Sequence, residues 1–308
     1  MDIKINENKL IELFVEIDEL LKAYDNYLRE KGLLGGLRPT RVPRLNASEV
    51  CTVLVAYHYA GYKCFEYYYR QVILGVHADC FPEAPGYEAF LGYVARAAMP
   101  LYLWLFHTAC KAQRTGLYFI DSKKLEVCHL RRERSHRVFK GIAAKGKSST
   151  GWFYGLKLHL VINNLGEVAS FLLTPGNVAD NNKGVLRYLL SPLKGTCVGD
   201  KGYFTSLFGW FYENGLELVK RPKKNMKALP VRPWKNRLIN MRPVIESVFD
   251  ILGTVCDIDH TRHRKPENAL SHILAGLLAY QKLKDKPKVF FPSITKEMGE
   301  EKRLLMAA

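Results

Sequence analysis

Hydrophobic and polar positions follow two different periods along the chain, and the period changes near residue 116. In 7–32 the apolar side chains recur every three or four positions, which places them on one stripe of an α-helix. A similar pattern covers 47–62 and continues through aromatic-rich segments to about residue 114. The pattern predicts an all-helical N-terminal region over 1–114. The first stripe consists of Leu10, Leu13, Phe14, Ile17, Leu20, Leu21 and Tyr24.

From residue 116 onward, short runs of apolar and β-branched residues predict strands. The first strand is 116–128, GLYFIDSKKLEVC, and the turn residues 163–166, NNLG, separate two further strands. Two more strands, within GTCVGDKGYF and LELVKR, alternate with predicted helices. This order predicts an α/β fold, a mixed five-stranded sheet with helices on its faces. We expect it to occupy 115–285 and to be followed by a polar C-terminal tail over 286–308.

The composition, 48% hydrophobic and 12% aromatic, is enough to bury a folded core. The N-terminus has no early apolar run, and charges interrupt the apolar stretches before the roughly 20 residues that span a membrane. The seven cysteines are scattered and include no Cys-x-x-Cys pair, as is typical of a reducing compartment. The sequence therefore predicts a soluble cytoplasmic protein without a membrane partner.

The net charge of +16 comes from one part of the chain. Residues 1–118 carry 13 basic and 13 acidic residues, whereas 119–308 carry 33 basic and 17 acidic residues. The excess is concentrated in 123–147 and 219–245, each of which has nine Lys or Arg residues. Binding to phosphates relieves such self-repulsion and releases counterions, whereas no basic amphipathic helix favours a membrane surface. Nucleic acid is therefore the expected partner.

Three acidic residues lie among apolar or small neighbours, where an uncompensated charge costs free energy. Asp121 lies in the first strand, Asp200 ends the fourth, and Glu246 follows Pro243 in a predicted helix. The first and fourth strands are expected to be neighbours, so that their carboxylates face one another near one edge of the sheet. Such carboxylates need a counter-charge, and oxygen-only ligands favour Mg²⁺ or Mn²⁺. Two such ions can clamp the attacking and leaving oxygens of a phosphodiester displacement.

Two other acids compete for the third position. Asp250 lies one helical turn after Glu246, on the same face of the predicted helix. Glu246 is favoured because it is closer to the positive end of the helix dipole. Asp180 is interpreted as part of a helix N-cap together with Asn181 and Asn182.

Several of these segments together resemble the DDE-type transposases of bacterial insertion sequences. The resemblance covers about 45–282 and is most specific at VGDKGYF and at the Asp-Ser pair of IDSKKLEVC. It departs from related groups around the third acid: upstream of Glu246, Ile239 stands in place of a Tyr although Arg242 is present, and seven residues downstream Gly253 stands in place of a Lys. The other supporting segments are GWFYGLKLHLVIN, TPGNVADN and RPVIESVF.

The resemblance implies an RNase H-like catalytic fold with a triad of Asp121, Asp200 and Glu246 that holds two Mg²⁺ or Mn²⁺ ions. It implies cleavage and joining of double-stranded DNA at the terminal inverted repeats of the element and in the target. It also implies a homodimer or larger assembly on nucleoid DNA in the bacterial cytoplasm. The helical N-terminal region would recognise the DNA ends or dimerise, and the sequence does not decide between these roles.

The expected DNA contacts are the basic residues that flank the acids, with Trp234 among them. Trp234 could stack on a frayed or flipped end base, or it could anchor its own loop. Two alternative functions are a metal-dependent nuclease that does not join strands and a non-catalytic DNA-binding descendant. The full set of expected contacts is Lys123, Arg131, Arg132, Arg134, Lys201, Lys220, Arg221, Lys223, Lys224, Trp234, Lys235 and Arg242.

Overall fold

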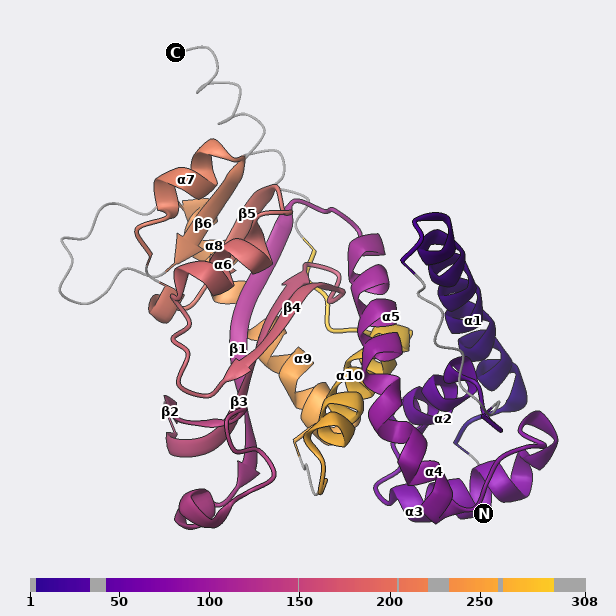
Figure 1. Cartoon of the computed structure of the whole chain (residues 1–308). Coiled ribbons are helices and arrows are strands. Elements are labelled where there is room, and N and C mark those ends of the chain that lie inside the picture. The colour runs from indigo at the N-terminus through magenta and orange to yellow at the C-terminus, as the bar shows by residue number, and fades with distance from the viewer. Residues whose placement is uncertain are drawn as a thin grey trace. The chain divides into compact units, whose positions relative to one another are not determined.

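The computed structural model of the chain forms two compact units, which we call the helical unit and the sheet unit (Figure 1). The helical unit takes the described residues of 1–108, 135–140 and 251–283, and the sheet unit takes those of 109–134, 141–250 and 284–308. The residues that the structure describes are 4–33, 43–148, 150–203, 205–220, 233–259 and 263–290.

The first two helices begin at side-chain caps. Helix α1 (Glu7–Glu30) follows Asn6, whose side chain accepts a hydrogen bond from the backbone N–H at the third helical position. Helix α2 (Ala47–Tyr59) begins with a reciprocal capping box between Asn46 and Glu49. The predicted helical character of the N-terminal region is confirmed over its described residues. The chain continues through α3 (Phe65–Tyr67), η1 (Tyr68–Val76), η2 (Ala78–Cys80), α4 (Tyr87–Val94), η3 (Ala95–Ala97) and α5 (Ala98–Lys111).

One helical stretch of the described residues, Tyr87–Lys111, is long and apolar enough to cross a membrane by length and composition alone. The sequence had not indicated such a stretch. Its residues Phe90, Leu101, Trp104 and Leu105 are fully buried in the structure. Only 33% of its most apolar window is buried, however, and Met99 and Phe106 are exposed.

Helix α10 (Pro266–Lys282) belongs to the helical unit, although the sequence placed it with the predicted sheet. Its residues 273–280 are all buried, and it packs against α2. Gly276 permits this packing, since a Cβ atom there would lie 2.3 Å from the Ile258 side chain. A helix that is apolar on every side needs neighbours around it, but its pattern does not say which neighbours.

The sheet unit contains a six-stranded mixed sheet in the order β2-β3-β1-β5-β6, with β4 also paired to β3 (Figure 1). Strand β1 is antiparallel to β3 and parallel to β5, which confirms the predicted neighbours. The prediction of five strands was one short, because AKGKS in β2 lacks the apolar alternation that marks a strand. The strands are β1 (Leu117–Cys128), β2 (Ala144–Ser148), β3 (Gly151–Asn163), β4 (Val168–Pro175), β5 (Gly195–Gly199) and β6 (Leu216–Lys220).

The predicted turn between β3 and β4 is present. The Asn163 side chain accepts hydrogen bonds from the backbone N–H groups of Leu165 and Glu167. Gly166 has φ of 77°, a conformation that favours glycine. A Cβ atom at this position would also lie 2.2 Å from the Pro287 carbonyl oxygen, so the turn requires glycine for two reasons.

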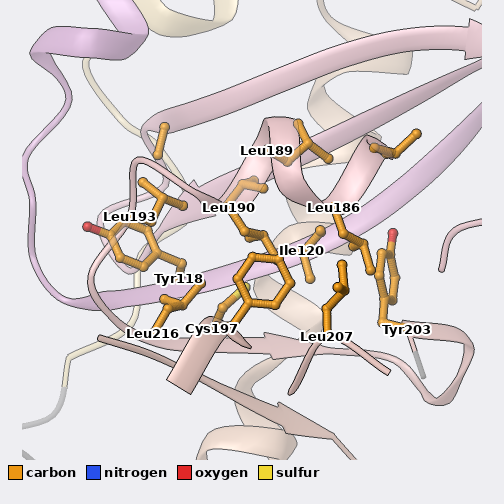
Figure 2. Close-up of a cluster of buried hydrophobic side chains, with 14 residues drawn as sticks. Tyr118, Ile120, Leu186, Leu189, Leu190, Leu193, Cys197, Tyr203, Leu207 and Leu216 are labelled. Atoms are coloured by element: carbon orange, nitrogen blue, oxygen red, sulfur yellow. The ribbon is translucent and has the colours of Figure 1, made fainter. Parts of the chain in front are cut away.

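One face of the sheet is covered by helices α6 (Lys183–Leu190) and α7 (Phe208–Glu213). Figure 2 shows Leu186 and Leu190 of α6 among the side chains of Tyr118 and Ile120 from β1. Successive side chains of a strand point to opposite faces, so Ser122 lies on this covered face and Asp121 on the other. The strand therefore presents two adjacent polar groups to two different environments.

Helix α8 (Pro233–Met241) was not predicted, because the basic residues of its segment conceal a short apolar stripe. Trp234, Leu238 and Ile239 form that stripe and are buried, and α8 packs against β5 and β6. Only 6% of Trp234 is exposed. Its position in this structure is that of an anchor, the second of the two roles suggested by the sequence. Helix α9 (Pro243–Thr254) follows directly and carries Glu246 in its first turn.

Candidate active site

Asp121 and Asp200 occupy equivalent positions on two paired strands. Strands β1 and β5 run parallel, and their last paired residues are Phe119 and Val198. Each acid lies two residues beyond this pair in its own chain segment. Gly199 keeps the two segments close, since a Cβ atom there would lie 3.1 Å from the Ile120 side chain. The expected approach of the first two acids thus follows from the register of the parallel pair.

Arg242 connects the third acid to the first. Its Nη1 atom lies 2.7 Å from Oδ2 of Asp121, and its Nη2 atom lies 2.6 Å from Oε1 of Glu246. Arg242 and Glu246 are four residues apart, so they share one face of the helical segment. The side chains of Asp121 and Arg242 are each 21% exposed, whereas that of Glu246 is 53% exposed. Asp250, the alternative third acid, lies one turn further along α9 and is exposed.

The Asp121 carboxyl group is electrostatically strained. Burial raises its pKa to about 6, and the neighbouring charge of Asp200 raises it as well. The Ser122 backbone N–H, which donates to Asp121 at 2.9 Å, and the Arg242 guanidinium lower the pKa without compensating fully. The charged form of Asp121 is therefore short of positive partners even with Arg242 in contact.

A polar cluster that the sequence did not predict lies on the opposite side of β1. The Ser122 hydroxyl donates a 2.7 Å hydrogen bond to Oδ1 of Asp180. The same carboxylate oxygen accepts a 3.2 Å hydrogen bond from Lys157, which is only 8% exposed and also donates to the Val178 carbonyl at 2.9 Å. Loss of either partner would leave the other charge poorly compensated in a partly buried place.

His159 completes this cluster from the next inward-facing position of β3. Its Nδ1 atom lies 3.9 Å from Asp180, and its Nε2 atom lies 3.0 Å from the Thr174 hydroxyl. Burial lowers the pKa of His159 to about 4, so the ring is neutral at pH 7. Asp180 is thus not the helix cap that we expected: Asn182 caps α6 by accepting from the N–H groups of Gly184 and Val185.

Tyr203 is buried and is influenced by the charges of Asp121 and Asp180. It ends η5 (Lys201–Tyr203), the turn after Asp200, and its backbone N–H donates to the Asp200 carbonyl at 3.0 Å. Burial raises the pKa of its hydroxyl well above the usual value, and the charges of Asp121 and Asp180 raise it further. The Asp-Lys-Gly-Tyr segment therefore places a neutral, buried phenol close enough to these two acids to feel their charge.

The carboxylates fit a divalent cation in donor type and in charge. They offer only oxygen donors, which Mg²⁺ and Mn²⁺ prefer, and the raised pKa of Asp121 indicates incompletely compensated negative charge. Within the described ranges, no group of three His, Cys, Asp or Glu side chains is already arranged around one metal position. Arg242 instead stands between Asp121 and Glu246 and supplies the counter-charge.

The expected DNA contacts differ in their surroundings. Arg131, Arg132 and Arg134 are exposed on η4 (Leu130–Ser135), and Lys201 is exposed directly after Asp200. Others are engaged within the protein: Lys235 pairs with Glu217, Arg242 with the two acids, and Lys220 lies over the Phe208 ring at 4.7 Å. Lys123 is half-buried in β1. Arg221, Lys223 and Lys224 lie outside the described residues.

Comparison with known proteins identifies the family. A family model described as a transposase DDE domain matches residues 111–266, which is half of the chain. The matched segment contains β1, β5 and the start of α9, and hence all three acids. A search of curated proteins found no match. The mixed sheet with flanking helices is consistent with the RNase H-like architecture of such domains, and the chain belongs to the family of transposases with a DDE domain.

Proposed function

We propose that this transposase cleaves DNA at the ends of an insertion sequence and joins those ends to target DNA. The proposal rests on one observation: Asp121 and Asp200 lie at equivalent positions beyond a parallel strand pair, and Arg242 links Asp121 to Glu246. These three acids are the proposed triad. Glu246 is preferred over Asp250 because Arg242 ties it to Asp121.

The triad carboxylates would hold two Mg²⁺ or Mn²⁺ ions. A bound divalent cation supplies Lewis acidity, which activates water or a 3′-hydroxyl and stabilises the leaving oxygen. Asp121, Asp200 and Glu246 would hold these ions and balance their positive charge, so that the ions and not the carboxylates face the reacting phosphate. No covalent link between protein and DNA is required, since water and 3′-hydroxyl groups are the nucleophiles.

The remaining residues serve DNA binding in this proposal. The exposed arginines of η4 and Lys201 contact backbone phosphates of the double-stranded DNA, at the terminal inverted repeats and in the target. The helical unit recognises DNA ends or brings two copies of the chain together, so that paired ends are processed by a homodimer or larger assembly. The protein works in the cytoplasm, on DNA of the nucleoid.

The experiment follows the fate of the DNA strands. Labelled duplexes that carry the terminal inverted repeats flanking the gene are incubated with the protein, a target plasmid and Mg²⁺ or Mn²⁺. Joined products of end and target are expected. Cleaved ends without joined products would instead support a nuclease. Binding without cleavage under any metal would support a non-catalytic DNA-binding protein.

A further inference from the structure

Trp152 is a tryptophan with its ring largely in water. It lies at the start of β3, and 56% of the residue is exposed. The other three tryptophans are better covered: Trp104 and Trp234 are 0% and 6% exposed, and Trp210 is 36% exposed. An indole that stays exposed does not contribute the large free energy that its burial would give. Its exposure is therefore expected to serve the binding of a partner.

Two lysines of the neighbouring strand flank the Trp152 ring. Lys147 is the direct cross-strand neighbour of Trp152, and Lys145 is paired with Tyr154 two positions further. Alternation along the strands places all three side chains on one face of the sheet. The ammonium groups of Lys145 and Lys147 lie 5.3 Å and 5.6 Å from the ring centroid. Both ammonium groups are within the range of a cation–π interaction with the ring.

The positive charge continues beyond this hairpin. The Lys145 ammonium lies 3.9 Å from the Glu133 carboxylate, which brings η4 alongside β2. Glu133 stands in η4 between the exposed residues Arg132 and Arg134. The ring thus belongs to a surface that is suited to a polyanion rather than to an apolar protein partner.

Protection of the sheet edge is a simpler explanation for the two lysines of β2. It does not explain why the Trp152 ring is exposed. Strand β2 lies at the edge of the sheet, and lysines on edge strands prevent pairing with other chains. That role needs charges alone. An exposed indole beside the lysines adds apolar surface, which favours association with other chains instead of preventing it.

We propose that Trp152 stacks on an unpaired base of bound DNA, while Lys145 and Lys147 contact the phosphates on either side of that base. Stacking on an aromatic ring together with cationic contacts is how proteins hold single strands without reading their sequence. This inference rests on the proposed function, since it assumes that DNA is the substrate.

The position of Trp152 also defines where along the DNA this contact falls. Asp121 is paired with Leu160 of β3, eight residues from Trp152. At roughly 3.3 Å per strand residue, the ring lies about 26 Å from the acid along the sheet. That span corresponds to about eight base pairs of B-form DNA. The contact therefore lies away from the cleaved bond, and the proposal requires an unpaired base at that distance.

Tryptophan fluorescence tests the proposal without knowledge of the element's ends. The full-length protein is titrated, in EDTA, with an oligothymidylate of about 15 nucleotides and with a blunt duplex of equal length. The variants are Trp152→Phe, Trp152→Ala and the matched control Trp210→Phe. Trp210 is a suitable control because it is also exposed and has the Arg187 guanidinium 5.6 Å from its ring.

Single-stranded DNA is expected to quench the wild type and Trp210→Phe, whereas Trp152→Phe loses most of the quenching and keeps its affinity within about threefold. Trp152→Ala is expected to bind the single strand about 5-fold to 100-fold more weakly, with little change for the duplex.

Unchanged quenching in Trp152→Phe, or an equal loss of affinity for both DNAs in Trp152→Ala, overturns the inference. If the inference is overturned but the wild type still joins DNA ends, the proposed function stands and only the stacking role of Trp152 is wrong. If the wild type binds no DNA, the proposed function fails with it.

Discussion

Arg242 donates a hydrogen bond of 2.7 Å to the Asp121 carboxylate, although the two residues are 121 positions apart in the chain. The same guanidinium donates to Glu246, so one cation serves two of the three proposed catalytic acids. Arg242 therefore occupies the electrostatic role that a divalent cation would take at this site.

Replacing Arg242 with Ala should destabilise the metal-free protein and strengthen its response to Mg²⁺. The loss leaves a partly buried carboxylate without its partner, and we expect the free energy of unfolding to fall by about 1–2 kcal/mol in EDTA. Without a competing guanidinium, the acids should bind the cation more tightly. Thermal melts with and without Mg²⁺ measure both effects, with Arg187→Ala as a surface control. A Mg²⁺-induced shift in Tm no larger than that of the wild type would contradict this account.

The raised pKa of Asp121 predicts that the wild type and Asp121→Asn differ in stability by an amount that depends on pH. The folded-state pKa of about 6 lies above the usual value of about 3.9, so the charged form costs stability in the folded state. That cost is complete above pH 6 and diminishes as the pH falls through this range. In EDTA at pH 8, Asp121→Asn should be up to about 2 kcal/mol more stable than the wild type, and the difference should vanish below about pH 4.

Urea unfolding across this pH range measures the difference, and Asp250→Asn provides an exposed acid on α9 for comparison. Mg²⁺ should reverse the order at pH 8, because it binds the folded wild type and not the variant. A wild type that is more stable than Asp121→Asn at pH 8 in EDTA would show that Arg242 compensates Asp121 fully.

The pairing of Lys157 with Asp180 predicts strong energetic coupling. Lys157 is 8% exposed and its ammonium lies 3.2 Å from the Asp180 carboxylate, so removal of either charge leaves the other poorly compensated. Lys157→Met and Asp180→Asn should each lower the free energy of unfolding by about 1–3 kcal/mol, and the double variant should lose clearly less than the sum.

The exposed pair of Arg70 and Glu66 in the helical unit, 2.8 Å apart, is the matched control, and its coupling should stay below about 0.5 kcal/mol. Equal coupling in the two cycles would mean that the Lys157–Asp180 contact is an ordinary surface ion pair. The same Asp180→Asn variant should retain some joining activity, since Asp180 contacts Ser122 rather than the proposed metal ligands.

The relation between the first two acids could be predicted from the sequence because it depends on strand order. Three predicted strands in succession, followed by alternating helices and strands, leave few arrangements, and the first and fourth predicted strands then pair in parallel. Each acid lies two residues beyond the last residue at which the two strands pair. The turn at Gly166 was equally predictable, since its residue types favour a hairpin.

Features that depend on tertiary partners could not be predicted. Any residue in the run from Asp180 to Asn182 could cap α6, and only the positions of Ser122 and Lys157 determine that Asp180 turns away. Similarly, the basic composition of α8 conceals the stripe that buries Trp234. Arg242 was expected to contact DNA, and its place between two acids depends on how the start of α9 meets β1.

The most direct test of the central claim, that Asp121, Asp200 and Glu246 form the catalytic triad, is a strand-transfer assay on the element's own ends with Mg²⁺ or Mn²⁺. It compares the wild type with Asp121→Asn, Asp200→Asn, Glu246→Gln and the control Asp250→Asn, and DNA binding is measured in parallel. We expect joined products from the wild type and Asp250→Asn, and none from the three triad variants, which still bind DNA. Joined products from Glu246→Gln but not from Asp250→Asn would contradict the triad and move its third member to Asp250.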